Sequence, residues 1–322
     1  MAGGVSTPEL AAAAGDAGGL GFLAGGYRTA AELAGDIAKT RALTSAPFGV
    51  NLFVPGDDRP EPEALRAYAE RISSDADLAG VTLGEPRADD DDWAAKFDGL
   101  LADPVPVVSF TFGCPTAERI AALRERGSRV WVTVTTPDEA LAADAAGADA
   151  LVVQGSEAGG HRAGFPAGGP EEGGEIGLLP LIALVRTVSG LPLVAAGGIM
   201  RDAAVAAVRS AGAGAAQAGT AFLLAPEAGT HPVHRAALRR PGRTALTRAF
   251  TGKPARGLVN EFMRRHSAYA PIAYPHIHHM TRPLRAAAGK AGDPDAMSLW
   301  AGQGFRLAEE RPAAEIVERL SP

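Results

Sequence analysis

The residues best suited to chemistry lie in one stretch, Val152–Arg162, which reads VVQGSEAGGHR. Small and β-branched residues over Ala150–Val153 predict a buried strand that ends in the polar side chain of Gln154. Gly159 and Gly160 then let the backbone approach a ligand, and His161 follows them directly. Imidazole titrates close to neutral pH and often serves as a general base. The stretch predicts a catalytic His161 at a strand's carboxyl end; a surface loop with a solvated histidine is the alternative.

A second set of candidate residues follows the last two predicted strands. One strand ends in Ala196-Gly197-Gly198 and the other in Gln217-Ala218-Gly219-Thr220. Bare backbone N–H groups stabilise anions, and the loops after the last two strands of (β/α)8 barrels often form a phosphate site. Two tight turns in a chain rich in alanine and glycine are the alternative. Neither stretch is a Walker loop, because no Gly-Lys-Ser/Thr follows.

Alternating strands and helices must position both sets of candidate residues, the His161 stretch and the glycine-rich strand ends. Strand-like apolar segments occur near residues 20, 49, 107, 131, 152, 194 and 216, with helical segments between them. This alternation predicts a parallel α/β sheet that binds ligands at the carboxyl ends of its strands. A (β/α)8 TIM barrel needs one strand more, and this chain opens on a helix cap at Thr7. We therefore expect a TIM barrel that apparently lacks its first strand.

The alternation stops after Pro226. We expect a barrel over residues 1–229, a smaller helical lid or substrate domain over 230–289, and helices over 290–322 that pack back on the barrel. Within the second part, Glu227–Arg256 is expected to be helical and Ala270–Pro283 irregular. The mouth between two such parts is a usual place for a small-molecule pocket.

Three histidines and a cysteine are weaker candidates. His276, His278 and His279 are close enough in sequence to suggest metal ligands, but their spacing fits no standard site, so lining a pocket is the better interpretation. Cys114 follows a predicted strand, and a buried inert thiol is the better interpretation of this lone cysteine. Tyr27, after a glycine pair, is expected either to line the pocket or to pack in the core.

Composition excludes several classes of partner. The chain has 322 residues, is 46% hydrophobic and carries a net charge of −6, without a run of lysine or arginine. Nucleic acid and anionic membrane surfaces are therefore not expected partners. The lone cysteine, the short apolar runs and the absence of a signal-peptide pattern favour a cytoplasmic protein. A homodimer is left open.

Several stretches together resemble the nitronate monooxygenases, formerly called 2-nitropropane dioxygenases. The Gly-Gly-His loop and the paired glycines are specific in combination, and the resemblance covers nearly the whole chain. The stretches that carry it are Ala2–Leu10, Gly18–Leu23, Pro47–Phe53, Gln154–Arg162, Ala195–Ile199, Gln217–Leu223 and Thr247–Lys253.

The resemblance implies an FMN enzyme on a (β/α)8 barrel. Such an enzyme oxidises alkyl nitronates, with nitroalkanes as further candidates, using O2 to give a carbonyl compound and nitrite. His161 matches the family's active-site histidine and is expected to be the base. Family members begin with a strand, roughly Pro-Ile-Ile-Gln-Ala-Pro, whose end touches FMN just before the Met-Ala-Gly that opens this chain. The residues that the resemblance places at FMN are Met1, Ala2, Gly3, Asn51, Gln154, Gly159, Gly197, Gly198, Gln217, Ala218, Gly219 and Thr220.

Two other functions compete with this interpretation. One is an FMN-dependent NAD(P)H:quinone or enoyl-thioester reductase with a similar barrel and Gly-Gly-His loop. The other is a barrel that binds a phosphate-bearing ligand without catalysis. The colour of the purified protein and its response to NADH or NADPH distinguish the three.

Overall fold

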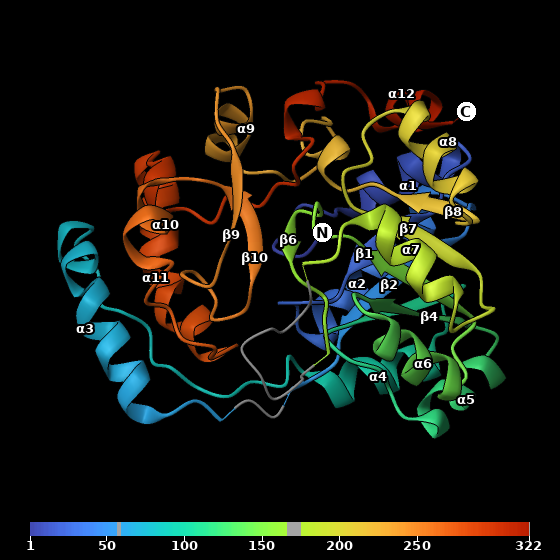
Figure 1. Ribbon diagram of the computed structural model, residues 1–322, viewed down its shortest axis with the longest axis horizontal. Helices are drawn as coiled ribbons and strands as arrows, with labels where there is room; N and C mark the ends of the chain where they lie inside the picture. Colours follow the sequence, from blue (N-terminus) through green and yellow to red (C-terminus); the bar gives the residue numbers. More distant parts are fainter. Residues whose placement is uncertain (57–58, 166–174, 322) are drawn as a thin grey trace.

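A parallel sheet of seven strands forms the larger part of the fold in the computed structural model, which describes residues 1–56, 59–165 and 175–321 (Figure 1). The hydrogen-bonded order is β1-β2-β3-β4-β5-β7-β8, and within the described residues β8 does not pair with β1. All seven expected strands are confirmed, in a TIM-barrel-like sheet. Their bounds are β1 Gly21–Ala24, β2 Phe48–Phe53, β3 Val107–Thr111, β4 Arg129–Val134, β5 Ala150–Gln154, β7 Leu193–Ala196 and β8 Ala215–Gln217.

Helices cover the outer face of this sheet. The expected cap at Thr7 is confirmed, since Thr7 accepts a hydrogen bond from Leu10 N at 3.0 Å. Thr136 likewise forms a capping box with Glu139. The helices of this part are α1 Pro8–Asp16, α2 Ala30–Leu43, α4 Trp93–Ala102, α5 Ala117–Glu125, α6 Pro137–Ala145, α7 Leu178–Arg186, α8 Asp202–Ser210, the short 3-10 helix η1 Thr220–Phe222 and α12 Ala313–Leu320.

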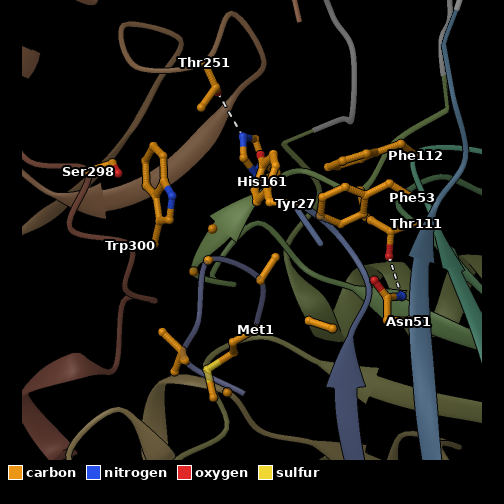
Figure 2. Close-up of a pocket in the computed structure, with 18 of the residues that line it drawn as sticks. Met1, Tyr27, Asn51, Phe53, Thr111, Phe112, His161, Thr251, Ser298 and Trp300 are labelled. Atoms are coloured by element: carbon orange, nitrogen blue, oxygen red, sulfur yellow. Dashed lines mark hydrogen bonds between the residues drawn. The ribbon is translucent and has the colours of Figure 1, made fainter. Parts of the chain in front are cut away.

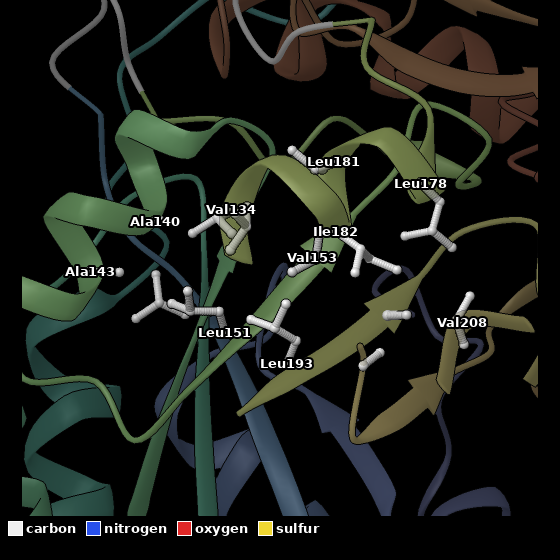
Figure 3. Close-up of a cluster of buried hydrophobic side chains, with 14 of the residues drawn as sticks. Val134, Ala140, Ala143, Leu151, Val153, Leu178, Leu181, Ile182, Leu193 and Val208 are labelled. Atoms are coloured by element: carbon white, nitrogen blue, oxygen red, sulfur yellow. The ribbon is translucent and has the colours of Figure 1, made fainter. Parts of the chain in front are cut away.

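The core lies between the strands and these helices. In one buried cluster, Leu151 and Leu193 of neighbouring strands pack with Leu181 and Ile182 of α7 (Figure 3). Burying each such aliphatic side chain contributes about 1.5–3 kcal/mol. The apolar packing holds the sheet rigid, so its carboxyl edge is a stable platform for polar residues.

A second, smaller sheet is antiparallel. Its order is β6-β10-β9, where β6 is Gly160–His161, β9 is Thr244–Thr247 and β10 is Ala255–Leu258. The strand β6 lies in sequence between β5 and β7 of the larger sheet, yet it pairs with β10. The stretch that carries His161 therefore connects the two sheets.

The expected helix over Glu227–Arg256 is wrong. Only α9, Pro232–Leu238, is helical there, and the β9–β10 hairpin follows. Pro241 and Gly242 stop the helix, and Gly252, with φ +81°, turns the chain back between the two strands. The threonines that begin and end β9 favour a strand.

The expected irregular structure over Ala270–Pro283 is also wrong in its second half. Helix α11 spans His276–Ala291 and continues through Pro283. Its buried residues Ile277, Met280 and Leu284 recur at helical spacing, and this packing outweighs the cost of the internal proline.

Helix α3, Pro62–Leu78, shares a core with α11 and with α10, Glu261–His266 (Figure 1). The hydroxyl of Tyr68 donates to Ala249 O at 2.6 Å, and Asp75 pairs with Arg265 and with His266 Nε2. The division of the chain at residues 229 and 289 remains a prediction. The structure adds that α3 belongs to the second core and that α12 packs against α1 and α8.

None of the helices in the described ranges is both long and apolar enough to cross a membrane.

Candidate active site

The second lobe consists of the smaller sheet and helices α3, α10 and α11. A cavity of about 1400 Å³ lies between this lobe and the carboxyl edge of the parallel sheet. All of the predicted site residues line it, although they come from widely separated parts of the sequence. Figure 2 shows Asn51, Phe53 and Phe112 on one side of this space, with His161 and Trp300 facing them. The structure thus brings the predicted residues together; the role of each remains a prediction.

His161 lies on the cavity wall. Its strand β6 pairs with β10, where Ala255 is opposite His161. The ring Nε2 lies 2.9 Å from Thr251 Oγ1, and the rings of Phe112, Tyr274 and Trp300 surround it, each with a centroid distance of 5.6 Å. The histidine faces this aromatic cavity, which contradicts the alternative of a surface loop with a solvated side chain.

Burial, with a smaller contribution from the nearby cations Lys253 and Arg285, lowers the pKa of His161 to about 3. The imidazole is therefore neutral at neutral pH, and a neutral imidazole has a lone pair that can accept a proton. The histidine is thus in the protonation state that a general base requires.

A buried guanidinium that sequence reasoning missed fixes the loop before His161. Arg162 donates from Nη1 to Gln154 Oε1 at 2.9 Å and to Gly155 O at 2.7 Å. Gln154 in turn donates from Nε2 to the carbonyl oxygen of His161 at 3.1 Å. Both ends of the Gln154 amide are thereby oriented, with one N–H hydrogen left for a ligand in the cavity.

Asn51 is oriented in a similar way at the end of β2. Its Nδ2 donates to Ser109 Oγ and to Thr111 Oγ1, both at 2.9 Å. No donor within the described ranges bonds Asn51 Oδ1. This side chain therefore offers the cavity a hydrogen-bond acceptor in a fixed position.

The glycines after β7 and β8 form an open backbone surface. Gly197 and Gly198 have φ of +121° and +69°, and within the described residues their N–H groups donate to no acceptor. Thr220 accepts a hydrogen bond from Gly302 N at 2.9 Å, so its own hydroxyl hydrogen remains free to donate. Unpaired N–H groups beside a hydroxyl donor suit the phosphate of a cofactor.

The second lobe contributes a cation. Arg285 is half-buried, donates to His278 O at 2.9 Å and to Thr281 Oγ1 at 3.1 Å, and has no carboxylate partner among the described residues. Burial lowers its pKa to about 10, so it is charged at neutral pH. The sequence around Arg285 does not identify it as a cavity residue, because its position depends on how α11 packs.

Two further candidates from the sequence lie beside this cation. Tyr27 stacks on His278 with a centroid distance of 4.3 Å, and its hydroxyl lies 3.3 Å from that of Tyr274. Of the three histidines expected to line the pocket, His278 and His279 do so, whereas His276 is not among the described lining residues; Tyr27 lines the cavity, the first of its two alternatives. His279 Nε2 lies 3.1 Å from Asp89 Oδ2. Cys114 is half-buried and packs against the core, and burial raises the pKa of the Cys114 thiol to about 11.

The fold and the position of the cavity define a TIM-barrel-like α/β enzyme with its site at the carboxyl edge of the sheet. The sequence model of the nitronate monooxygenase family matches residues 1–322, and the chain belongs to this family of flavin-dependent monooxygenases.

Individual relatives agree with this assignment. The nitronate monooxygenase of Pseudomonas aeruginosa is 41% identical over 98% of this chain and 92% of its own length. A probable nitronate monooxygenase of Bacillus subtilis is 36% identical over 99% of this chain and 93% of its own length. Among solved structures, nitroalkane oxidase from Streptomyces ansochromogenes has a TM-score of 0.96 at 54% identity, over 99% of this chain and 92% of that one. FabK from Thermotoga maritima has a TM-score of 0.76 at 29% identity, over 99% of this chain and 89% of the FabK chain.

Proposed function

We propose that this protein is an FMN-dependent nitronate monooxygenase that oxidises alkyl nitronates, and nitroalkanes after removal of their α-proton, with O2 to carbonyl compounds and nitrite. One observation supports this most: His161 and the unpaired N–H groups of Gly197 and Gly198 line a single cavity. A phosphate-bearing cofactor and a proton acceptor would then act on one bound substrate.

The described residues suit FMN. The N–H groups of Gly197, Gly198 and Gly219, with the Thr220 hydroxyl, would hold its phosphate. Asn51 and Gln154 would present an acceptor and a donor to its ring system. Gly159 lines the same cavity, and an added Cβ there would lie 2.5 Å from Gly302 N, so the close packing of these two backbone segments requires glycine. The remaining residues expected to line the cofactor are Met1, Ala2, Gly3, Gln217 and Ala218. FMN, when bound, would supply the electron chemistry between substrate and O2.

His161 would act on the proton. With a neutral nitroalkane, the C–H bond breaks, the proton moves to the imidazole, and the electron pair passes into the nitro group to give the nitronate. The developing negative charge on the substrate raises the proton affinity of the nearby histidine, which offsets the pKa-lowering effect of burial. With a nitronate this step is not needed, and the residue then orients the substrate.

Arg285 and Lys253 would favour the anionic substrate. Both line the cavity and both lower the pKa of His161, so their positive field reaches the imidazole. A negative charge placed there would be stabilised, because the half-buried charge of Arg285 is screened less than a charge at the open surface.

Arg285→Gln is therefore expected to raise KM for a nitronate about tenfold, since a hydrogen bond or charge contact to an ionic group contributes about 1.5 kcal/mol. The KM for the corresponding neutral nitroalkane should change much less. Steady-state kinetics with both substrates check this, and Arg264→Gln, on an exposed side chain of α10, is the control. An equal rise in both KM values would contradict the anion-binding role.

Anaerobic spectroscopy tests the proposed function itself. We expect purified, FMN-reconstituted protein to be yellow and its oxidised-flavin band to bleach on addition of a nitronate, followed by recovery and nitrite release when O2 is admitted. Rapid bleaching by NADH or NADPH instead would favour the competing quinone or enoyl-thioester reductase. A protein that stays colourless with FMN would favour a barrel that binds a phosphate-bearing ligand without catalysis.

A further inference from the structure

Thr251 occupies a fixed position beside His161. It lies in the loop between β9 and β10 and is 1% exposed. Its own N–H donates to Arg248 O at 3.2 Å, and the next residue, Gly252, accepts a hydrogen bond from Ala273 N at 3.0 Å. These contacts tie the hairpin loop to the chain before α11. The Thr251 hydroxyl is therefore held in place independently of the cavity contents.

That hydroxyl has two neighbours and one hydrogen. Thr251 Oγ1 lies 3.2 Å from Lys253 O and 2.9 Å from His161 Nε2 (Figure 2). A carbonyl oxygen can only accept, so the threonine hydrogen is directed to Lys253 O. The lone pair of Oγ1 then faces His161, and the contact is a hydrogen bond only if Nε2 carries the proton.

We propose that Thr251 is a positioning residue that fixes His161 as the Nε2–H tautomer, so that Nδ1 is the nitrogen that takes the substrate proton. No donor or acceptor among the described residues bonds Nδ1, and the histidine lines the cavity. The role of Nδ1 as base depends on the proposed nitroalkane chemistry; the tautomer does not.

The arrangement suits both protonation states of the histidine. Before transfer, Nε2–H donates to Thr251 and Nδ1 holds the free lone pair. After the substrate C–H bond breaks, Nδ1 also carries a proton and the electron pair resides on the nitro group. The hydrogen bond from Nε2–H to Thr251 persists unchanged, so no protein group has to reorient during the transfer.

Nitrogen-15 NMR of histidine-labelled, FMN-loaded protein tests the tautomer directly. The signals of His161 are assigned by their loss in His161→Asn, since the chain has 7 histidines. We expect Nε2 of the wild type to show the shift of a protonated nitrogen and Nδ1 that of an unprotonated one. In Thr251→Val this preference should be lost or reversed. A wild-type spectrum with the proton on Nδ1 would overturn the proposal.

Kinetics of two matched variants test the consequence for the reaction. Thr251→Val keeps the side-chain shape but removes the acceptor, and we expect kcat/KM for a neutral nitroalkane to fall about 10–100-fold, by analogy with the loss of a partner that orients a metal-bound histidine. Thr251→Ser retains the hydroxyl and should stay within about threefold of wild type. Turnover of a pre-formed nitronate should fall much less than that of the nitroalkane in Thr251→Val, and FMN content should match wild type in both variants.

The two readouts separate this inference from the function on which it rests. If the wild type turns over neither substrate, the proposed function fails, while the NMR spectrum still reports whether Thr251 fixes the tautomer. If Thr251→Val retains full activity on the nitroalkane, or loses activity equally on the nitronate, the positioning role in proton transfer is wrong.

Discussion

His161→Asn is expected to lower kcat/KM for a neutral nitroalkane by about 10²–10⁴-fold, the usual contribution of a general base. The substituted side chain retains polarity but has no basic nitrogen. The loss with the pre-formed nitronate should be smaller, because its α-proton is already gone. Kinetics of the two proteins with a nitroalkane and its nitronate measure the difference.

The cofactor provides the control for this variant. The glycines proposed to bind phosphate lie on β7 and β8 loops, away from Thr251 and the hairpin that contacts His161. FMN content should therefore match wild type. Equal losses on both substrates would indicate charge stabilisation or positioning instead of proton transfer. No loss on either would remove His161 from the reaction.

The pKa of His161 predicts how kcat/KM for a neutral nitroalkane depends on pH. An ordinary histidine base, with a pKa near 6.5, loses activity as the pH falls below that value. Burial lowers the pKa of His161 to about 3, so its neutral form persists through this range. We expect kcat/KM of the wild type for a neutral nitroalkane to show no decline attributable to His161 between about pH 5 and 8. A decline centred near 6.5 that disappears in His161→Asn would contradict this.

The strands and the cavity residues of the larger sheet could be predicted from sequence because their signals are local. Short apolar segments separated by capped helices identify the strands, and the polar or glycine residues that end them necessarily meet at one edge. Gln154, Gly198 and Gly219 could be placed in this way although they are far apart in the chain. Asn51 stands out as the one polar residue in an apolar strand.

The second lobe could not be predicted as well, because its structure depends on distant contacts. β6 contains only Gly160 and His161, and it forms because β10 offers a partner some ninety-five residues later, Ala255 opposite His161. The segment of α11 contains Pro283 and three histidines, and its apolar face matters only against α3 and α10. Thr251 and Arg285 acquire their positions from these packings, so the pattern of strands and helices indicates neither, although Thr251 lies in the Thr247–Lys253 stretch that resembles the family.

Gly198→Asp is expected to abolish stoichiometric FMN binding. The residue has φ +69°, and its N–H is one of those proposed to hold the phosphate. A carboxylate there would face the phosphate: two unit charges about 4 Å apart near a protein surface repel by about 4 kcal/mol, which weakens binding roughly 10³-fold. Left-handed backbone adds about 1–2 kcal/mol of strain for a residue with a Cβ.

Two further variants separate the charge from the strain. Gly198→Ala introduces the left-handed penalty and a Cβ 3.3 Å from Glu157 Cβ, without the negative charge, and should retain part of the flavin. Gly80→Asp adds the same carboxylate at a similar φ of +64°, where a new Cβ meets no atom within 4 Å, and should bind FMN like wild type. Flavin absorbance per protein after reconstitution and dialysis measures all three. Stoichiometric FMN in folded Gly198→Asp would place the phosphate elsewhere in the cavity, since a carboxylate and a phosphate cannot both occupy the one backbone surface at low cost.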